Sequence, residues 1–343
     1  MQRFLFILYI VFIVIQISFA QGKKNIEQGF IRFYNDNDYY KMRDGTDQYY
    51  TNGFAFEYQP KQNNRNVGIR AIFPKLSSQQ MTYTSPRFGL VMQAYTPENA
   101  YDTLSQHLSR PFAGLAYFTV SGVSNDVWKG ERLTTSYGLG MIGPRTYQGA
   151  MQLWFHKISD RKAPKGWNQQ IANDLALNAN LQYEKGIWNP ASPLEFIGLA
   201  EANCGSVMNY ASLGGLFRLG FMNDYFLNAS GLSPKITKRA GKLPSRRIFS
   251  ENFNRRTQMY FYGKTLGRFV LDNSLLEGGY FNFKNSPYKL TKSETEKFYA
   301  QFEFGYVFST RFFSVSFSQT FRTKEFKTGK SAQWGTVGLT IGI

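Results

Sequence analysis

The sequence predicts an all-β protein: a twelve-stranded antiparallel transmembrane β-barrel with a signal peptide. Three observations predict this fold. Apolar and polar residues alternate one by one along segments about ten residues long, which is the length of a tilted strand that crosses a bilayer. The number of these segments is even, as in bacterial barrels. Aromatic residues make up 17% of the 343 residues and charged residues only 18%, as expected for a wall with aromatic girdles.

The N-terminus has the pattern of an export signal. An unbroken apolar run at residues 4–15 follows Arg3, and Ser18-Phe19-Ala20 supplies the small residues of a cleavage site. We therefore expect a signal peptide at residues 1–20 and one barrel domain at 21–343. An uncleaved anchor helix is the alternative, but the run is short for a span of about 20 residues.

Strict alternation defines the strands. In Asp174–Glu184 the odd positions from Leu175 to Tyr183 are apolar, and most residues between them are polar. The twelve predicted segments are 28–35, 51–59, 86–95, 113–122, 131–141, 174–185, 193–202, 213–222, 257–270, 297–308, 311–322 and 332–343. Residues 66–73 and 276–284 are candidates for further strands or loop ribbons. A soluble secreted β-sandwich is the alternative fold, but its strands are usually shorter.

Strand parity predicts the sidedness of the connections. With a periplasmic N-terminus, residues 36–50, 96–112, 142–173, 203–212, 271–296 and 323–331 are extracellular. The Ser309-Thr310 turn is then periplasmic and short, as expected. Residues 60–85 and 223–256 fit badly, because both are long for periplasmic connections. The second also carries a basic cluster between Lys235 and Arg256.

Composition excludes several classes of site and partner. One cysteine, Cys204, and two histidines rule out an internal disulfide and any multi-cysteine or poly-histidine zinc site. The formal net charge is +17. An exported protein does not work on nucleic acid, so we expect no nucleic-acid partner. The basic surplus instead indicates an anionic lipid, a glycan or another envelope partner.

Two polar clusters lie on the predicted extracellular side. Asn35-Asp36-Asn37-Asp38 and Thr46–Gly53 offer oxygen ligands suited to calcium, although Asn, Asp and Gly also fill ordinary turns. Residues 149–157 are expected to form a short helix with Gln152 and His156 on one face. Histidine is the best general base near neutral pH, but a lone histidine is more often an ordinary polar residue.

These motifs occur together in the order of a known family. The sequence resembles the outer-membrane lipid A 3′-O-deacylases, and the resemblance runs from residue 30 to the C-terminus. It is carried by Asn37-Asp38, by Thr46-Asp47 with Tyr50-Thr51-Asn52-Gly53, by Arg110-Pro111-Phe112-Ala113-Gly114, by Gly143-Pro144, by Gln152 with His156, and by Gly166-Trp167 with Gln170. Read alone, the Arg110–Gly114 segment is a turn that enters a strand.

The resemblance implies an activity and a place of action. It implies a calcium-dependent hydrolase in the outer membrane that removes the 3′-linked acyloxyacyl group from lipid A, the membrane anchor of lipopolysaccharide. His156 would be the base that activates water. Asn37, Asp38 and Thr51 match the other active-site positions.

The remaining site assignments follow the same resemblance. Asp38 and Asp47 are the expected calcium ligands, because their carboxylates suit a hard cation. Gln152, Arg145 and Lys157 are the expected substrate contacts, the two cations facing the lipid A phosphates. The repeat Asn35-Asp36-Asn37-Asp38 leaves the register open by two, and the second pair is preferred for its distance to Thr46-Asp47.

One position departs from the family. Its members carry an active-site lysine after a Tyr-Ser/Thr-Pro segment, whereas here Tyr95-Thr96-Pro97 is followed by Glu98 and no lysine comes directly after it. This puts the partner of the oxyanion, or the position of the substrate, in question. Two other functions stay open: a non-enzymatic porin-like or adhesin-like barrel, and an outer-membrane phospholipase with the same chemistry.

Overall fold

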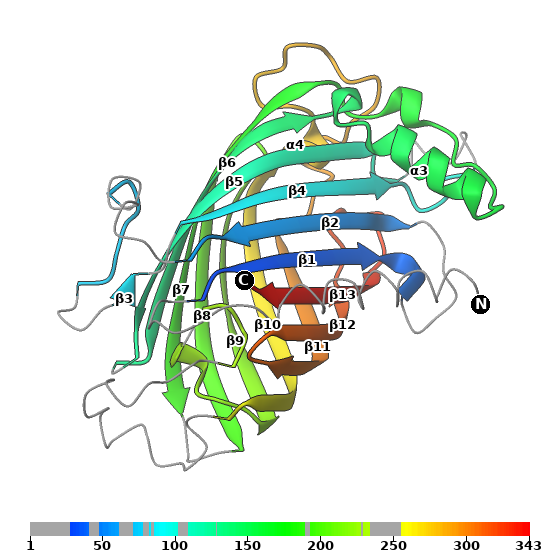
Figure 1. Cartoon of the computed structure of the whole chain (residues 1–343). Helices are drawn as coiled ribbons and strands as arrows, with labels where there is room; N and C mark the ends of the chain where they lie inside the picture. Colours follow the sequence, from blue (N-terminus) through cyan, green and yellow to red (C-terminus); the bar gives the residue numbers. More distant parts are fainter. Residues whose placement is uncertain are drawn as a thin grey trace.

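The protein forms a β-barrel whose strands tilt around a filled interior (Figure 1). The structure is a computed structural model. It describes residues 28–40, 48–61, 71–77, 82–83, 86–101, 109–127, 129–188, 193–227, 229–233 and 255–343. The expected signal peptide at residues 1–20 lies outside these ranges. No helix within them combines the length and the hydropathy that a bilayer crossing requires.

In the described part of the chain, twelve long strands form the ring, and all neighbours pair antiparallel. They are β1 (Phe30–Asn37), β2 (Tyr49–Gln59), β4 (Arg87–Thr96), β5 (Ala113–Asp126), β6 (Glu131–Ile142), β7 (Asp174–Trp188), β8 (Leu194–Gly205), β9 (Met208–Phe221), β10 (Thr257–Asn273), β11 (Phe298–Thr310), β12 (Phe313–Arg322) and β13 (Ala332–Gly342). Pairing of β1 with β13 and of β5 with β6 completes the closure. Every predicted segment is confirmed as a strand.

One short strand was not expected. β3 (Thr82–Tyr83) pairs with β5 at Asn125 and Ser124, just beyond the last pair of β4 with β5. β3 therefore takes the place of β4 as the partner of β5 beyond Pro86. Proline has no N–H and cannot donate a hydrogen bond to the neighbouring strand. Residues 71–73, which were a candidate strand segment together with 66–70, form a turn.

The apolar face of the wall points outward. On β7, Leu177 and Leu181 are 37% and 40% exposed, whereas Glu184 is 3% exposed and faces the interior. Phe118 on β5 is 70% exposed. A soluble β-sandwich buries its apolar face, so this orientation excludes the sandwich and is typical of a wall in contact with lipid.

The interior is held by arginine–carboxylate pairs, each stacked on an aromatic ring. The pairs are Arg32–Glu57, Arg132–Glu184, Arg218–Glu195 and Arg268–Glu201, at 2.9, 3.4, 2.6 and 3.2 Å. Their guanidinium groups lie over the rings of Phe30, Tyr225, Tyr260 and Tyr210. Pairing and stacking together offset the cost of taking these charges out of water.

Residues 222–227 and 229–233 cross the interior near the end where β1 begins. They contain the short 3-10 helix η7 (Tyr225–Leu227). Arginines of four strands donate hydrogen bonds to their backbone carbonyls: Arg32 to Ser230, Arg87 to Ala229, Arg132 to Tyr225 and Arg218 to Asn223. The first part of the long connection at 223–256 therefore folds back into the barrel and plugs it. The basic residues from Lys235 to Arg247 lie outside the described residues.

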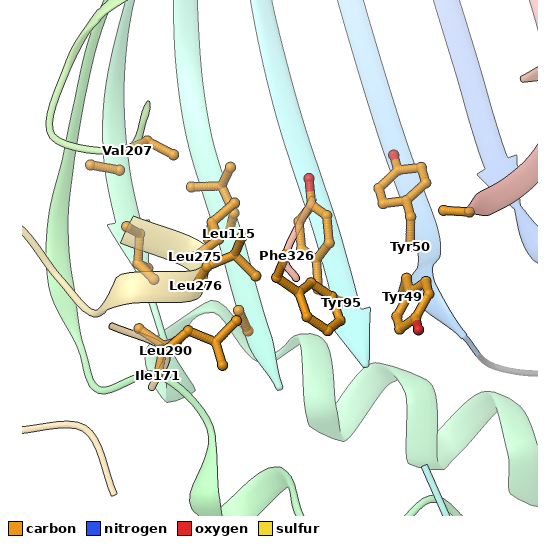
Figure 2. Close-up of a cluster of buried hydrophobic side chains, with 14 of the residues drawn as sticks. Tyr49, Tyr50, Tyr95, Leu115, Ile171, Val207, Leu275, Leu276, Leu290 and Phe326 are labelled. Atoms are coloured by element: carbon orange, nitrogen blue, oxygen red, sulfur yellow. The ribbon is translucent and has the colours of Figure 1, made fainter. Parts of the chain in front are cut away.

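The opposite end, where α3 (Gln148–Ile158) lies, is filled by an apolar cluster. Tyr49, Tyr50, Tyr95 and Leu115 point inward from the wall and meet loop residues such as Phe326 (Figure 2). The helix α4 (Ser274–Glu277) brings Leu275 and Leu276 into the same cluster. Residues 276–284 are therefore a helix end and an irregular loop, not a strand.

Two predicted turns need correction. The connection expected at 203–212 is only the Ser206-Val207 turn, because β8 and β9 run on to Gly205 and from Met208. The turn expected at Ser309-Thr310 lies at Arg311-Phe312, because Thr310 still belongs to β11. Strand ends lack a distinct alternation signal, so their boundaries shift by a few residues.

A buried carboxylate joins the rim of the barrel at the α3 end. Glu325 accepts from Arg110 at 3.2 Å and from Arg322 at 3.1 Å, and the Arg110 and Glu325 side chains are 1% and 8% exposed. Burial lowers the pKa of the Arg110 guanidinium, and the charge of Glu325 opposes this shift.

We expect Glu325→Gln to lower the free energy of unfolding by about 3–5 kcal/mol, because it leaves a buried arginine without a countercharge. Urea unfolding in detergent, followed by heat-modifiable migration, measures this change. Glu296→Gln is the matched control, since Glu296 forms a more exposed pair with Lys324 at 2.9 Å and should cost less than about 1 kcal/mol. Equal stability of the two variants would contradict the role of Glu325.

Candidate active site

The end of β1 separates the two Asn-Asp pairs. Asp36 points into the barrel, where its carboxylate accepts from the Tyr50 hydroxyl at 2.6 Å and from the Thr336 hydroxyl at 2.7 Å. Asn37 is the last residue of β1, and Asp38 begins the 3-10 helix η2 (Asp38–Tyr40). The Asp36 carboxylate is thus engaged by two hydroxyl groups inside the barrel, and Asp38 belongs to a different environment.

The helix η2 folds over the outside of the wall. The Tyr40 hydroxyl donates to Asn35 Oδ1 at 2.8 Å, and the Tyr40 carbonyl accepts from Gln319 Nε2 at 2.7 Å. Gly335 lies beneath it, and a Cβ there would be 2.6 Å from Tyr40 Cβ. Asp38 is 4% exposed, and its Oδ2 accepts a hydrogen bond from the backbone N–H of Gln48 at 3.3 Å. The Asp38 carboxylate is therefore buried at the rim of the outer wall.

A β-bulge on β2 places Thr51 beside this cluster. The register between β2 and β4 shifts between Tyr50 and Asn52, so Thr51 is the extra residue. Its hydroxyl lies 2.7 Å from that of Thr96 at the end of β4, and both residues are buried. On the outer side of the same strand, Asn52 Oδ1 accepts from Asn35 and Asn37 at 3.1 and 3.3 Å. A polar patch thus interrupts the apolar exterior.

The helix α3 lies at the same end of the barrel, next to the ends of β4 and β5 (Figure 1). The chain reaches it through the 3-10 helix η5 (Pro144–Thr146). Contact with β5 requires Gly114, because a Cβ there would be 2.3 Å from Thr146 Oγ1. The expected helix over residues 149–157 is confirmed, and the first residue of α3, Gln148, packs on Gly114 of the Arg110–Gly114 segment.

Gln152 is fixed by a tryptophan. Trp167, in the 3-10 helix η6 (Trp167–Gln169), donates its indole N–H to Gln152 Oε1 at 2.7 Å. An indole only donates, so the amide oxygen faces the ring and Gln152 Nε2 faces away from it. Within the described residues this buried Nε2 has no hydrogen-bond partner. A buried amide donor with a fixed direction is therefore available one helical turn before His156.

His156 is held by its own loop. Its side chain is buried, and Nδ1 lies 2.7 Å from the carbonyl oxygen of Lys162. A carbonyl only accepts, so Nδ1 carries the proton and Nε2 is the basic nitrogen of the neutral ring. The backbone carbonyl plays the orienting part that a carboxylate plays in many catalytic triads.

The loop after α3 brings the two predicted clusters together. The Arg161 guanidinium lies over the ring of Tyr39, 4.5 Å from its centroid, and Tyr39 directly follows Asp38. The Lys162 ammonium lies 5.3 Å from the centroid of the Tyr101 ring. Lys165 N–H donates to the Ala100 carbonyl at 2.7 Å. The segment that orients His156 therefore contacts both η2 and the connection after β4.

Three predicted residues are not joined to this arrangement by described side-chain contacts. Arg145 and Lys157 are exposed. Asp47 lies outside the described residues, as does His107, the second histidine of the chain. No group of three or more His, Cys, Asp and Glu side chains in the described ranges has the arrangement of a metal site.

Glu98, the residue that follows Tyr95-Thr96-Pro97, has a cationic partner. Glu98 forms an ion pair with Lys330 of the connection between β12 and β13, and this pairing raises the pKa of the Lys330 ammonium. The Tyr49 hydroxyl links the two, since it accepts from Lys330 N at 3.0 Å and donates to Glu98 at 3.3 Å. A cation therefore does stand close to this position, from a connection more than 200 residues away in the chain.

The sequence did not single out the residues that connect the clusters. By sequence Tyr39 is an ordinary loop residue, Arg161 is one of several cations expected near the lipid A phosphates, and Thr96 is only part of a family segment. Only Trp167 carried a signal, because it belongs to the Gly166-Trp167 motif. A contact between two loops cannot be read from either loop alone.

Comparison with known proteins identifies the family. A family model described as outer membrane protein LpxR matches residues 5–343. This chain belongs to the LpxR family. The family-level resemblance seen in the sequence is thereby confirmed, and so is an outer-membrane barrel.

One solved structure supports the fold. LpxR from Salmonella typhimurium matches with a TM-score of 0.67 and 17% identity, over 92% of this chain and 100% of that chain. The β domain of the Bordetella autotransporter BrkA matches at 9% identity with a TM-score of 0.45, over 92% of this chain and 98% of that one. A search of curated protein sequences found no match.

Proposed function

We propose that this protein is a lipid A deacylase that hydrolyses the ester of the 3′-linked acyloxyacyl group in the outer leaflet. Membership of the LpxR family supports a role in lipid A modification. The proposed chemistry rests on one observation, the environment of the buried His156. Its Nδ1 is hydrogen-bonded to the Lys162 carbonyl, and Arg161 of the same loop stacks on Tyr39, the residue after Asp38. In this tautomer Nε2 is the ring nitrogen that can take a proton from water.

The position of the site suits a substrate that stays in the membrane. The residues lie on the outside of the wall at one rim, where Asn35, Asn37 and Asn52 interrupt the apolar surface. We infer that this rim is the extracellular one, so that a lipid ester reaches the site by lateral diffusion. Arg145 and Lys157 are exposed on the same side and would attract the phosphates of lipid A.

In the proposed reaction, His156 Nε2 removes a proton from water as its oxygen attacks the ester carbonyl carbon. The carbonyl oxygen becomes an oxyanion in the tetrahedral intermediate. As the carbon–oxygen bond to the sugar breaks, the imidazolium returns the proton to the leaving sugar oxygen. The products are a free fatty acid and a sugar hydroxyl, and the base is restored.

Gln152 would donate to the oxyanion. Its Nε2 is buried, is aimed by the Trp167 bond to Oε1, and has no partner among the described residues. A pre-positioned donor of this kind stabilises charge that develops only in the transition state. Asn37 would fix the start of η2, since its carboxamide oxygen accepts from Tyr39 N at 2.8 Å, and Thr51 would contribute its hydroxyl from β2.

Calcium is part of the proposal. The side chains of Asp38, Asn37 and Thr51 carry oxygen atoms of the kind that bind a hard cation, and the Asp38 side chain is buried just after β1. Asp38 and Asp47 would hold the ion, together with backbone or hydroxyl oxygens. Bound there, calcium would supply positive charge to the ester carbonyl and its oxyanion.

Two other functions have less support. A porin needs an open lumen, whereas residues 222–227 and 229–233 and the apolar cluster at the α3 end fill much of this one. A phospholipase would use the same base, and the family rather than the site geometry favours lipid A.

His156→Ala should lower the rate of deacylation by about 10²–10⁴-fold while the barrel stays folded, because it removes only the base. Mass spectrometry of lipid A from cells that carry each variant measures the acyl pattern, and heat-modifiable migration measures folding. His107→Ala is the control and should act like the wild type. A folded His156→Ala barrel with the wild-type rate would overturn the role of His156, and a wild-type protein that leaves lipid A intact would overturn the function.

Removal of calcium by a chelator should abolish deacylation, and added calcium should restore it. Asp38→Asn should mimic chelation, because it removes the charge of the expected ligand. Asp36→Asn should be milder, since Asp36 faces the interior and binds Tyr50 and Thr336. Full activity in excess chelator would remove calcium from the mechanism, and the opposite order of the two variants would move the site to Asp36.

Gln152→Met should lower the turnover rate of the saturated enzyme by about 10²–10³-fold, as the loss of one oxyanion donor does elsewhere. Gln148→Met is the matched control on the same helix. It is equally buried, but its unpartnered atom is the acceptor Oε1, which cannot stabilise an oxyanion. Turnover would be measured on purified lipid A in detergent. Equal losses in both variants would show a packing role for Gln152 instead.

A further inference from the structure

The polarity of α3 is inverted relative to a helix on a soluble protein. Its buried face carries Gln148, Gln152 and His156. Its outward face carries Leu153, Trp154, Phe155 and Ile158, which are 40%, 62%, 46% and 45% exposed. A surface helix in water buries its apolar residues and exposes its polar ones. The outward face of α3, meaning these four residues, is therefore built for apolar surroundings.

The outward face of α3 continues the lipid-facing surface of the barrel. The segment that leads into α3 packs on Gly114 of β5, on the outside of the wall. The next outward residues along β5 and the neighbouring β6 include Phe118 and Leu139, which are 70% and 59% exposed. The helix thus lies at the rim of the barrel, next to the ends of β4 and β5, where the apolar exterior ends (Figure 1).

Positive charges follow the outward face at the C-terminal end of the helix. Lys157 is exposed, and Arg161 and Lys162 lie over Tyr39 and Tyr101 at the rim. Apolar side chains followed by cations and aromatic rings match the order of an outer leaflet, with acyl chains below and anionic headgroups above. The charge pattern therefore favours a lipid layer as the occupant of this face.

We propose that the outward face of α3 is inserted among the acyl chains of the outer leaflet and that the helix is an interfacial anchor. Because His156 lies on the opposite face of the same helix, the depth of the anchor sets the depth of the site. The insertion itself does not depend on the proposed function, whereas its effect on ester positioning does rest on it.

A fluorescent label reports the depth directly. In the full-length protein with Cys204→Ala, the variants Trp154→Cys and Ile158→Cys each carry an environment-sensitive fluorophore and are inserted into phosphatidylcholine vesicles. Lys292→Cys is the control, since Lys292 is exposed in the connection after α4. Bromine on the acyl chains should quench the labels at 154 and 158 and leave the label at 292 unchanged.

The other outcomes overturn the proposal. Labels at 154 and 158 that behave like the label at 292 would place the outward face in water. Labels that are shielded from water but are not quenched by bromine would indicate a second copy of the chain as the occupant. Heat-modifiable migration confirms that each labelled variant is folded.

The effect on the site needs a second measurement. Trp154→Glu with Ile158→Glu should reduce deacylation of lipid A in bilayers but not of lipid A dispersed in detergent micelles, because neither residue lies on the His156 face. Equal loss in both media would show damage to the site and not to the anchor. Quenched labels in a protein that leaves lipid A intact would retain the anchor and reject the proposed function.

Discussion

The pairing of the first strand with the last is the constraint on which the rest of the structure depends. β1 and β13 pair from Phe30↔Gly342 to Asn37↔Gly335, and this pairing closes the ring. Its last pair also decides where the chain leaves the sheet. Asp36 is still inside the ladder and faces inward, whereas Asp38 is already outside it and begins η2. A shift of one residue in this register would exchange the inward and outward faces of β1.

Closure also explains the interior. A barrel wall that faces lipid must turn its polar residues inward, where arginines and carboxylates would be costly without partners. Here each interior arginine–glutamate pair is stacked on an aromatic ring, and several arginines also hold the carbonyls of residues 222–233. The same side chains thus neutralise the interior and retain the plug, so a long connection that looked anomalous becomes part of the packing.

The candidate site lies where polar residues interrupt the apolar exterior of the barrel. The outer wall is apolar except near the rim, where Asn35 and Asn37 of β1 donate hydrogen bonds to Asn52 of β2. Polar groups at a lipid boundary need local partners, and η2 and α3 supply the cover that buries Asp38 and His156. A site outside the barrel can meet a lipid without drawing it into the filled interior, which fits the proposed substrate.

The sequence by itself determined the strands, because a period of two is a local property of the chain. It also determined the short helix around His156, the even strand number and, through ordered motifs, the family. It could not determine the bulge at Thr51, the stacking of Arg161 on Tyr39 or the pairing of Glu98 with Lys330, since these contacts join residues far apart in the chain. Nor did the Asn35–Asp38 repeat show which aspartate leaves the barrel. Only ring closure decides that, because the inward or outward direction of a side chain exists only once the strand has neighbours on both sides.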